Sequence, residues 1–298
     1  MECNNISLQV PDGQVRTLVF SLTDGLNDVQ WQSSSGACAI LNCLLKFRGS
    51  ELSNEVATIV EKIMTNLEAV TYAQTITGSL VSLRTLASHH LVKVVQAFLE
   101  FPLPLKPNVC DFWKTLAKDK DLLVDTFDHL LGLLHRLPPY TSQEEAHRDG
   151  SNTIRVANKQ PLAIAAAFTE IFKVPESEVM TNKMFPRLLA SIFLQMGSSL
   201  GLTWASHSPS TNPKDPKSKK KELSTPTSIT PAQLSMNLFR EFVNHNKAMF
   251  IKHVLEDADA WKLFEDEDTL VEGLQVLLLS LLKGDRTGFE DLVSLKVL

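Results

Sequence analysis

Apolar residues recur along most of this chain with the spacing of an amphipathic α-helix. Between Ala37 and Leu45 they fall at i, i+3, i+4, i+7 and i+8, and a similar stripe runs from Val56 to Leu67. Further stripes occupy 91–99 and 164–172, and the last runs from Leu270 to Leu281. A period of two, which would indicate a strand, holds over no more than a few residues anywhere. The chain is therefore predicted to be all-α and to contain no strands.

Turn signals divide the predicted helices into about six consecutive pairs. The spacing of these pairs brackets the roughly 40 to 47 residues of a HEAT-type repeat. We therefore predict one HEAT-like α-solenoid domain over residues 1–298, an armadillo-type superhelix, with a generic helical bundle as the alternative. The expected pairs are 13–24 with 28–47, 52–68 with 71–88, 89–100 with 107–118, 120–136 with 155–174, 176–202 with 231–246, and 248–262 with 266–284.

The first pair has the clearest local signals. Asn27-Asp28 marks the turn between its helices, and the aspartate is expected to cap the second helix by accepting an amide hydrogen bond. Gly49 is expected at the C-cap of that helix. The small residues 33–37 predict the close approach of a neighbouring helix. Trp31 and Trp113 are interpreted as core or inter-repeat packing residues.

Proline positions agree with these boundaries. Segments 101–105 and 137–140 each hold two prolines and are predicted to form rigid corners between helices. The polar segment from Thr141 to Asn152 is expected to be a mobile loop. The prolines expected to open a helix, where a missing amide hydrogen costs nothing, are Pro161, Pro186 and Pro231.

Residues 206–230 differ in composition from the rest of the chain. They include four prolines, five lysines and almost no apolar residues. Such a segment cannot bury enough surface to offset its ordering entropy, so we predict a disordered basic insertion within the fifth pair. The lysine run is interpreted as a solvated linker, with a nuclear-localisation or acidic-partner motif as the alternative. The lysines that would form that motif are Lys217, Lys219, Lys220 and Lys221.

The same segment holds three Ser/Thr-Pro dipeptides. Phosphorylation of Ser208, Thr225 or Thr230 would lower the local positive charge and could act as a switch. Such dipeptides are common in linkers, so the pattern alone does not establish a modification site.

Composition and charge exclude several classes of protein. The chain is 44% hydrophobic and 21% charged, which excludes disorder of the whole chain. Its net charge of −5 provides no basic field, so no nucleic-acid partner is expected. The longest apolar stretch, 276–282, is far below the roughly 20 residues of a membrane span. Residues 1–5 show no export signal, so we expect a reducing, cytoplasmic location, or a nuclear one if the lysine run acts as an import signal.

No histidine pattern predicts a metal site. Zinc proteases place two histidines four residues apart with a glutamate between them, and no such pair occurs. His245 and His253 would share a face only if one helix ran unbroken through Asn246. The histidines are His89, His90, His129, His135, His147, His207, His245 and His253.

The cysteines and glycines predict no catalytic chemistry either. Cys3, Cys38, Cys43 and Cys110 lack metal-ligand spacing, and Cys38 and Cys43 are interpreted as small core residues. Gly36 follows three serines, but a nucleophile elbow needs a strand before the turn. We therefore expect no catalytic, cofactor-binding or metal residues, no cofactor and no enzyme activity.

The segment from Glu256 to Asp268 carries seven acidic residues and one lysine around Trp261 and Phe264. One interpretation is an acidic-aromatic docking surface. The other is that Asp266 and its acidic neighbours precede a helix beginning near Thr269 and stabilise its dipole.

The stretch 98–140 has a more specific pattern. It combines the corner Phe101-Pro102-Leu103-Pro104 with Trp113, Leu116, Leu130-Leu131 and Pro139-Tyr140. This pattern resembles the maestro heat-like repeat family, whose members carry a similar FPLP corner, a tryptophan-bearing short helix and a PY dipeptide at comparable spacing. Residues 183–189, before a long apolar helix, are similar to the family's next segment. The resemblance covers about residues 15 to 280.

The resemblance implies HEAT repeats with no established catalytic motif. Family members are usually far longer, so the chain is expected to be a fragment, a short isoform or a short member. Neither 1–10 nor 284–298 has the pattern of a polar capping repeat, so self-association through uncapped ends is one expectation. We expect a non-enzymatic scaffold or adaptor for unidentified protein partners. The alternative is a transport or regulatory adaptor that binds a charged peptide through its inner helices or basic linker.

Overall fold

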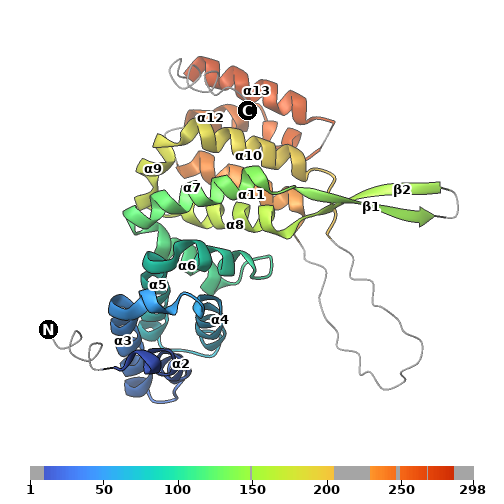
Figure 1. Cartoon of the computed structure of the whole chain (residues 1–298). Coiled ribbons are helices and arrows are strands. Elements are labelled where there is room, and N and C mark those ends of the chain that lie inside the picture. Colours follow the sequence, from blue (N-terminus) through green and yellow to red (C-terminus); the bar gives the residue numbers. More distant parts are fainter. Residues whose placement is uncertain (1–9, 148–149, 205–228, 246–248, 267, 285–298) are drawn as a thin grey trace. The chain divides into compact units, whose positions relative to one another are not determined.

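The computed structural model describes residues 10–147, 150–204, 229–245, 249–266 and 268–284 (Figure 1). The chain divides into two compact units. The first holds the residues up to 134 together with 167–183, and the second holds 135–166 and the residues from 184 onward. The expectation of one domain over 1–298 stays a prediction.

The first unit is built entirely from helices in its described residues. Its α-helices are α2 (Val15–Gly25), α3 (Trp31–Arg48), α4 (Val56–Asn66), α5 (Ala73–Leu99), α6 (Pro107–Ala117), most of α7 (Lys120–Arg136), the end of α8 (Lys159–Phe172) and α9 (Glu178–Lys183). Short 3-10 helices are η1 (Asp12–Gln14), η2 (Gly49–Leu52) and η3 (Pro175–Ser177).

The apolar stripes of the sequence form the core of this unit. Along α4, Val56, Ile59, Val60 and Ile63 are at most 1% exposed. Burying each such aliphatic side chain contributes on the order of 1.5 to 3 kcal/mol. The helical period of the sequence therefore predicts correctly which face of α4 is inside.

Small residues allow α3 to approach its neighbours closely, as predicted. Ser34 is fully buried, and its hydroxyl donates to the Leu26 carbonyl at 2.7 Å and lies 2.9 Å from the Thr75 hydroxyl on α5. A Cβ added at Gly25 would lie 3.1 Å from the Ala37 side chain. Gly49 occupies the predicted C-cap of α3.

Two predictions for the start of α3 are wrong. Asp28 Oδ1 accepts the amide hydrogen of Gln30 at 2.7 Å, one residue before the helix, so the carboxylate orders the turn and does not cap a helical amide. Trp31 is 46% exposed at the first position of α3, so it is not a core residue. Trp113 is 1% exposed and is a core residue as predicted.

The aromatic residues around the FPLP corner pack together. Phe98 on α5 stacks on Phe112 of α6 with ring centroids 3.5 Å apart. Trp113 meets both rings edge-on at 6.0 and 5.5 Å. The corner therefore reverses the chain, so that α6 and the C-terminal end of α5 share one aromatic core. The Leu103–Pro104 peptide bond of the corner is cis.

The predicted boundary between the helices 71–88 and 89–100 appears as a kink. Residues Ala73–Leu99 form one element, α5, but His90 has non-helical backbone angles of φ −142° and ψ 50°. Its Nε2 lies 2.9 Å from the Gly49 carbonyl oxygen. The helix direction changes where the sequence pattern predicts a new helix to begin.

The second unit combines helices with one β-hairpin. Its elements are the end of α7, β1 (Tyr140–His147), β2 (Gly150–Ala157), the start of α8, α10 (Phe185–Ser199), α11 (Pro231–His245), α12 (Met249–Asp257), η4 (Ala260–Phe264) and α13 (Leu270–Gly284). Phe239 of α11 lies at the centre of its aromatic core, within 5.6 Å, centroid to centroid, of Phe193, Trp261 and Phe264.

The hairpin corrects three expectations: the absence of strands, a mobile loop over 141–152 and a helix from 155. Strands β1 and β2 pair antiparallel from Tyr140↔Ala157 to His147↔Gly150, and they extend away from the helices (Figure 1). Thr203 adds a short parallel bridge at the base, donating to the Arg155 carbonyl at 3.1 Å and accepting from the Ala157 amide at 2.9 Å. Cross-strand hydrogen bonds satisfy the backbone of this polar segment, and α8 begins only at Lys159.

The region predicted as one helix over 176–202 is divided. It forms the end of η3, then α9 and α10, because Pro186 in the first turn of α10 supplies no amide hydrogen to continue the preceding helix. The other two prolines also lie at helix starts: Pro161 is in the first turn of α8, and Pro231 opens α11. Residues 248–262 likewise divide into α12 and η4, separated by Asp259, whose φ is +46°.

Most of the predicted insertion, 206–228, lies outside the described residues, as do Ser208, Thr225 and the lysine run. Its last two residues belong to the folded part. The Ile229 carbonyl accepts the Trp204 indole hydrogen at 2.9 Å, and the Thr230 hydroxyl accepts the Gln233 amide hydrogen at 3.1 Å. Thr230 therefore caps α11.

Candidate functional site

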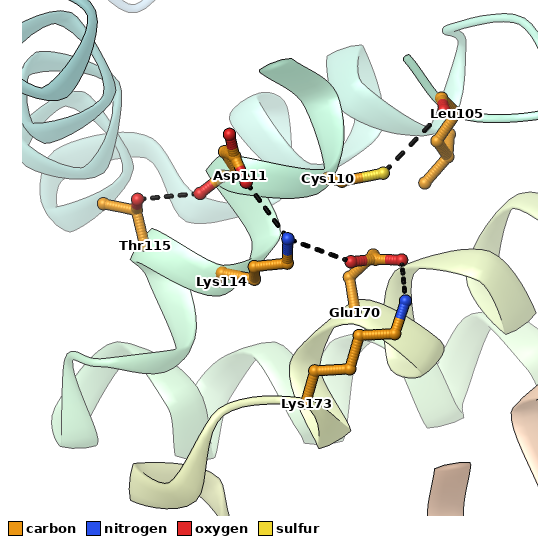
Figure 2. Close-up of polar contacts among 7 residues, drawn as sticks. All are labelled: Leu105, Cys110, Asp111, Lys114, Thr115, Glu170 and Lys173. Carbon is orange, nitrogen blue, oxygen red and sulfur yellow. Dashed lines mark hydrogen bonds and ion pairs between the residues drawn. The ribbon is translucent and has the colours of Figure 1, made fainter. Parts of the chain in front are cut away.

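A charged cluster joins α6 to the end of α8 in the first unit. On each side an acid lies three residues before a lysine: Asp111 and Lys114 are on α6, and Glu170 is on α8 with Lys173 directly after the end of that helix. Figure 2 shows the four side chains in a row, linked by ion pairs. Lys114 Nζ lies 3.1 Å from Asp111 Oδ1 and 3.5 Å from Glu170 Oε2, and Lys173 Nζ lies 2.6 Å from Glu170 Oε1.

The cluster compensates a buried charge. Glu170 is 8% exposed, and an unpaired carboxylate at such a position would be strongly destabilising. Burial alone would lower the pKa of Lys114, but its hydrogen bond to Asp111 and the charges of Asp111 and Glu170 outweigh burial, so that pKa is raised. The lysine therefore stays charged at neutral pH and holds the two helices together.

Cys110 lies beside this cluster. Its thiol donates a long hydrogen bond to the Leu105 carbonyl, with the sulfur 3.8 Å from the oxygen (Figure 2). Burial, together with the negative charge of Glu170, raises the pKa of Cys110 to about 11, although Lys114 and Lys173 act in the opposite direction. The thiol is therefore protonated at neutral pH and is a poor nucleophile.

The other described cysteines lie in the core, as predicted. Cys38 and Cys43 are 5% and 8% exposed. Burial raises the pKa of Cys38, and its hydrogen bond with Ser79 offsets this only in part. Cys3 lies outside the described residues.

The described histidines are spread over α5, α7, β1, α11 and α12. α11 ends at His245 and α12 begins at Met249, so no unbroken described helix joins His245 to His253. His135 Nε2 lies 3.0 Å from the Ser191 hydroxyl. Within the described ranges, no group of three His, Cys, Asp or Glu side chains is placed to hold a metal ion.

A pocket of about 490 Å³ opens between the first half of α11 and η4 in the second unit. Met236 and Phe264, which are 4% and 1% exposed, provide its apolar lining. Asn237, Arg240 and Glu265 provide polar groups at its edge. Arg240 Nη2 lies 3.6 Å from Glu265 Oε1, so these two largely exposed side chains form an ion pair.

The pocket revises the docking surface considered for 256–268. Phe264 is buried, so it is not an exposed docking side chain. Trp261 is half-buried, with its ring against Phe239 and the Arg240 guanidinium 5.5 Å from its centroid. Asp266 Oδ1 accepts the Asp268 amide hydrogen at 3.1 Å just before α13.

Neither the charged cluster nor the pocket is apparent from sequence alone. Residues 111–114 and 170–173 are about 60 positions apart in the sequence, and only the repeated acid–lysine spacing was a signal. The pocket's polar edge follows positions 233, 237 and 240 of α11, a helical spacing that is equally typical of a solvated face.

The helices follow one another in pairs that bury one face, and the titratable groups of the charged cluster are engaged in internal ion pairs. These features define a helical-repeat protein of the HEAT type. Residues 4–126 match the family model described as Maestro, HEAT repeats. The chain is 36% identical to Maestro heat-like repeat-containing protein family member 1 of Dictyostelium discoideum over 75% of this chain and 13% of that protein. It is 29% identical to the Mus musculus member 1 over 66% of this chain and 12% of that protein.

A Caenorhabditis elegans homolog of member 1 is 24% identical over 93% of this chain and 16% of that protein. The chain belongs to the maestro heat-like repeat family, which confirms the resemblance and the all-α solenoid class predicted from sequence. It covers only 12 to 16% of the length of these relatives. None of the helices in the described ranges is both long and apolar enough to cross a membrane.

Proposed function

We propose that this chain is a non-enzymatic HEAT-repeat scaffold that binds other proteins through exposed helix faces. The observation that carries the proposal is the two-sided apolar character of α13. Leu277 is fully buried on one side, whereas Val271, Leu278 and Leu279 are 62%, 46% and 56% exposed on the other. A helix that is apolar on both sides is normally covered on both sides, so the outer face of α13 is suited to a protein partner.

Affinity purification of the whole chain from cell lysate, followed by mass spectrometry, tests this proposal. The informative variant is Leu278→Ser/Leu279→Ser, which makes the outer face polar. Its matched control is Glu272→Ser/Gln275→Ser, which alters exposed polar positions of the same helix. We expect a reproducible partner that the control retains and the leucine variant loses. A partner retained equally by both variants would contradict the proposed use of α13.

A second candidate function is a transport or regulatory adaptor that binds a charged peptide. The charge imbalance of segment 256–268 favours it as the alternative. A deletion of 206–227 separates a role of the basic linker from a role of the helices, because it keeps Ile229 and Thr230, which contact Trp204 and cap α11. A partner lost only with this deletion would place binding on the lysine run.

The location and assembly of the chain are part of the proposal. We infer a cytoplasmic protein without nucleic-acid partners or cofactors, and a nuclear one if Lys217 and Lys219–Lys221 act as an import signal. Imaging a fluorescent fusion beside a variant with these lysines changed to glutamine distinguishes the two locations. Self-association through uncapped ends predicts a mass above 33.1 kDa by light scattering.

A further inference from the structure

We propose that the pocket between α11 and η4 binds a short peptide segment in which an aliphatic residue is followed by a basic one. The inference rests on the proposed protein-binding function and names the chemistry of one partner segment. The pocket volume of about 490 Å³ lies within the roughly 300 to 1,000 Å³ typical of ligand sites. All its lining residues belong to the second unit.

The apolar part of the pocket accounts for the aliphatic residue. Met236 and Phe264 line it and are otherwise buried, with Ala232 beside them on α11. A flexible thioether beside an aromatic ring adapts to side chains of different shape. When an aliphatic side chain of the peptide leaves water and packs on this surface, the hydrophobic effect contributes to the binding affinity without requiring a specific geometry.

Polar groups at the edge suit the backbone of an extended peptide. Asn237 offers one acceptor and two donor hydrogens, and no hydrogen bond joins its amide to another of the described side chains. Gln233 is already engaged, because its Oε1 accepts the Thr230 amide hydrogen at 2.9 Å. Asn237 is therefore the side chain placed to bond a peptide group entering the pocket.

The ion pair at the edge is weak enough to exchange partners. Arg240 and Glu265 approach only to 3.6 Å, and their side chains are 45% and 59% exposed. Such exposed pairs contribute little to stability, because water screens the charges and both side chains lose conformational freedom. Arg240 also lies over the Trp261 ring at 5.5 Å, so it keeps one favourable contact if Glu265 turns to a ligand.

The surrounding charge selects a basic residue over an acidic one. Asp266 and Asp268 lie one and three residues after Glu265 and are both exposed. The lysine of η4, Lys262, is already 2.9 Å from Asp259, and its pKa is raised by that hydrogen bond. Glu265 is the acidic residue of the lining, with Asp266 and Asp268 close to it in the chain, so a lysine or arginine would be attracted here and an acidic residue repelled.

Fluorescence anisotropy with two synthetic peptides tests the inference on the purified whole chain. Both are fluorescein-labelled alanine hexapeptides with one leucine, followed by lysine in one and by glutamate in the other. We expect saturable binding of the lysine peptide and at least tenfold weaker binding of the glutamate peptide. Glu265→Gln should weaken the lysine peptide about threefold or more, consistent with one surface charge pair, and Asn237→Ala should weaken both peptides.

Matched controls make the test specific to the pocket. Asp257→Asn removes an exposed carboxylate outside the pocket, and Asn244→Ala removes an exposed amide further along α11. Both should leave the lysine peptide unaffected, and circular dichroism checks that every variant is folded. Equal binding of the two peptides, no saturable binding, or binding unchanged by Glu265→Gln and Asn237→Ala would each overturn the inference.

The outcome is distinguishable from failure of the proposed function. Loss of the peptide site with a partner still captured through α13 overturns only the pocket inference. If the Leu278→Ser/Leu279→Ser variant captures the partner as well as the unaltered chain does, the proposed use of α13 is contradicted, irrespective of the result of the peptide-binding measurement.

Discussion

Gly78 allows α5 to lie directly against α3. A Cβ added at this position would lie 2.5 Å from the Cys38 sulfur. The Gly78 carbonyl accepts a hydrogen bond from the side-chain amide of Asn42 at 3.0 Å. We expect Gly78→Ala to lower the free energy of unfolding by about 1 to 3 kcal/mol, because the added methyl group overpacks this contact. Urea denaturation followed by circular dichroism measures the change.

Gly36 is the matched control for this substitution. It is also a helical glycine, but an added Cβ would meet nothing within 4 Å. Gly36→Ala should be neutral or stabilising by up to about 1 kcal/mol. Adding Cys38→Ala to Gly78→Ala should recover part of the loss, because it removes the clashing sulfur. Similar denaturation midpoints for the two single glycine variants would show that the close approach is not energetically important.

The reactivity of Cys110 reports on the charged cluster beside it. Burial, assisted by Glu170, raises the pKa of this thiol from 9.0 to about 11. The thiolate fraction at pH 7.5 is therefore about 100-fold smaller than for an ordinary cysteine. Alkylation of Cys110 by iodoacetamide should be slow at neutral pH and should keep rising up to about pH 11, as measured by mass spectrometry of the cysteine-containing peptide.

Two substitutions in the cluster should change this profile in opposite directions. Glu170→Gln removes a negative charge that disfavours the thiolate, so it should lower the pKa of Cys110 and accelerate alkylation. Lys173→Gln removes a positive charge and should do the reverse. Glu170→Gln keeps the shape of the original side chain and Lys173→Gln keeps a long polar one, so shifts of equal sign would indicate altered packing and not charge.

At the level of single elements, the capping box at the start of α11 is the clearest test. Thr230 Oγ1 accepts the Gln233 amide hydrogen at 3.1 Å, and Gln233 Oε1 accepts the Thr230 amide hydrogen at 2.9 Å. Thr230→Ala should lower the free energy of unfolding by about 0.5 to 2 kcal/mol. Hydrogen exchange should show faster exchange in the first turn of α11.

Thr230→Ser is the control for the loss of the cap. It keeps the hydroxyl that accepts the hydrogen bond, so its stability should be close to that of the unaltered chain. An equal loss for Thr230→Ser and Thr230→Ala would assign the effect to the threonine methyl group and contradict a capping role.

Helix periodicity predicted most of the helices, but it predicted neither the hairpin nor the division of 176–202 and 248–262 into shorter elements. The stripe of α4 has an unbroken 3.6-residue period, and every apolar position in it is buried. In contrast, 140–157 carries few apolar residues, and the alternation at Ile154 and Val156 is only three residues long. The available signal was Asp149-Gly150, a dipeptide common in hairpin turns.

The charged cluster and the pocket depend on tertiary structure that local patterns do not contain. Lys114 and Glu170 meet because the fold makes α6 and α8 neighbours. Phe127 of α7 packs against the same end of α8, with its ring centroid 5.3 and 6.3 Å from those of Phe168 and Phe172. The pocket likewise needs Asp259 to reverse the chain before η4 brings Phe264 to α11. Residue type and spacing alone do not specify which helices become neighbours.

At the scale of the whole molecule, the basic segment interrupts a packed pair of helices. α10 and α11 flank it and share a core, with Phe193 and Phe239 ring centroids 5.5 Å apart and the Ser199 hydroxyl donating to that of Ser235 at 2.8 Å. Because this packing does not depend on the connecting segment, cutting the connection should leave the helices associated. Composition predicts that the lysine run is accessible to protease.

Limited trypsin digestion should therefore cut first within 214–221 and yield two fragments. On a native size-exclusion column they should co-elute at the position of the intact chain, and on a denaturing gel they should separate. A variant with 206–227 replaced by a short Gly/Ser linker should resist this first cut. Fragments that separate under native conditions would show that the α10–α11 core cannot hold the chain without its covalent link, and a first cut within a described helix would contradict the predicted accessibility of the basic segment.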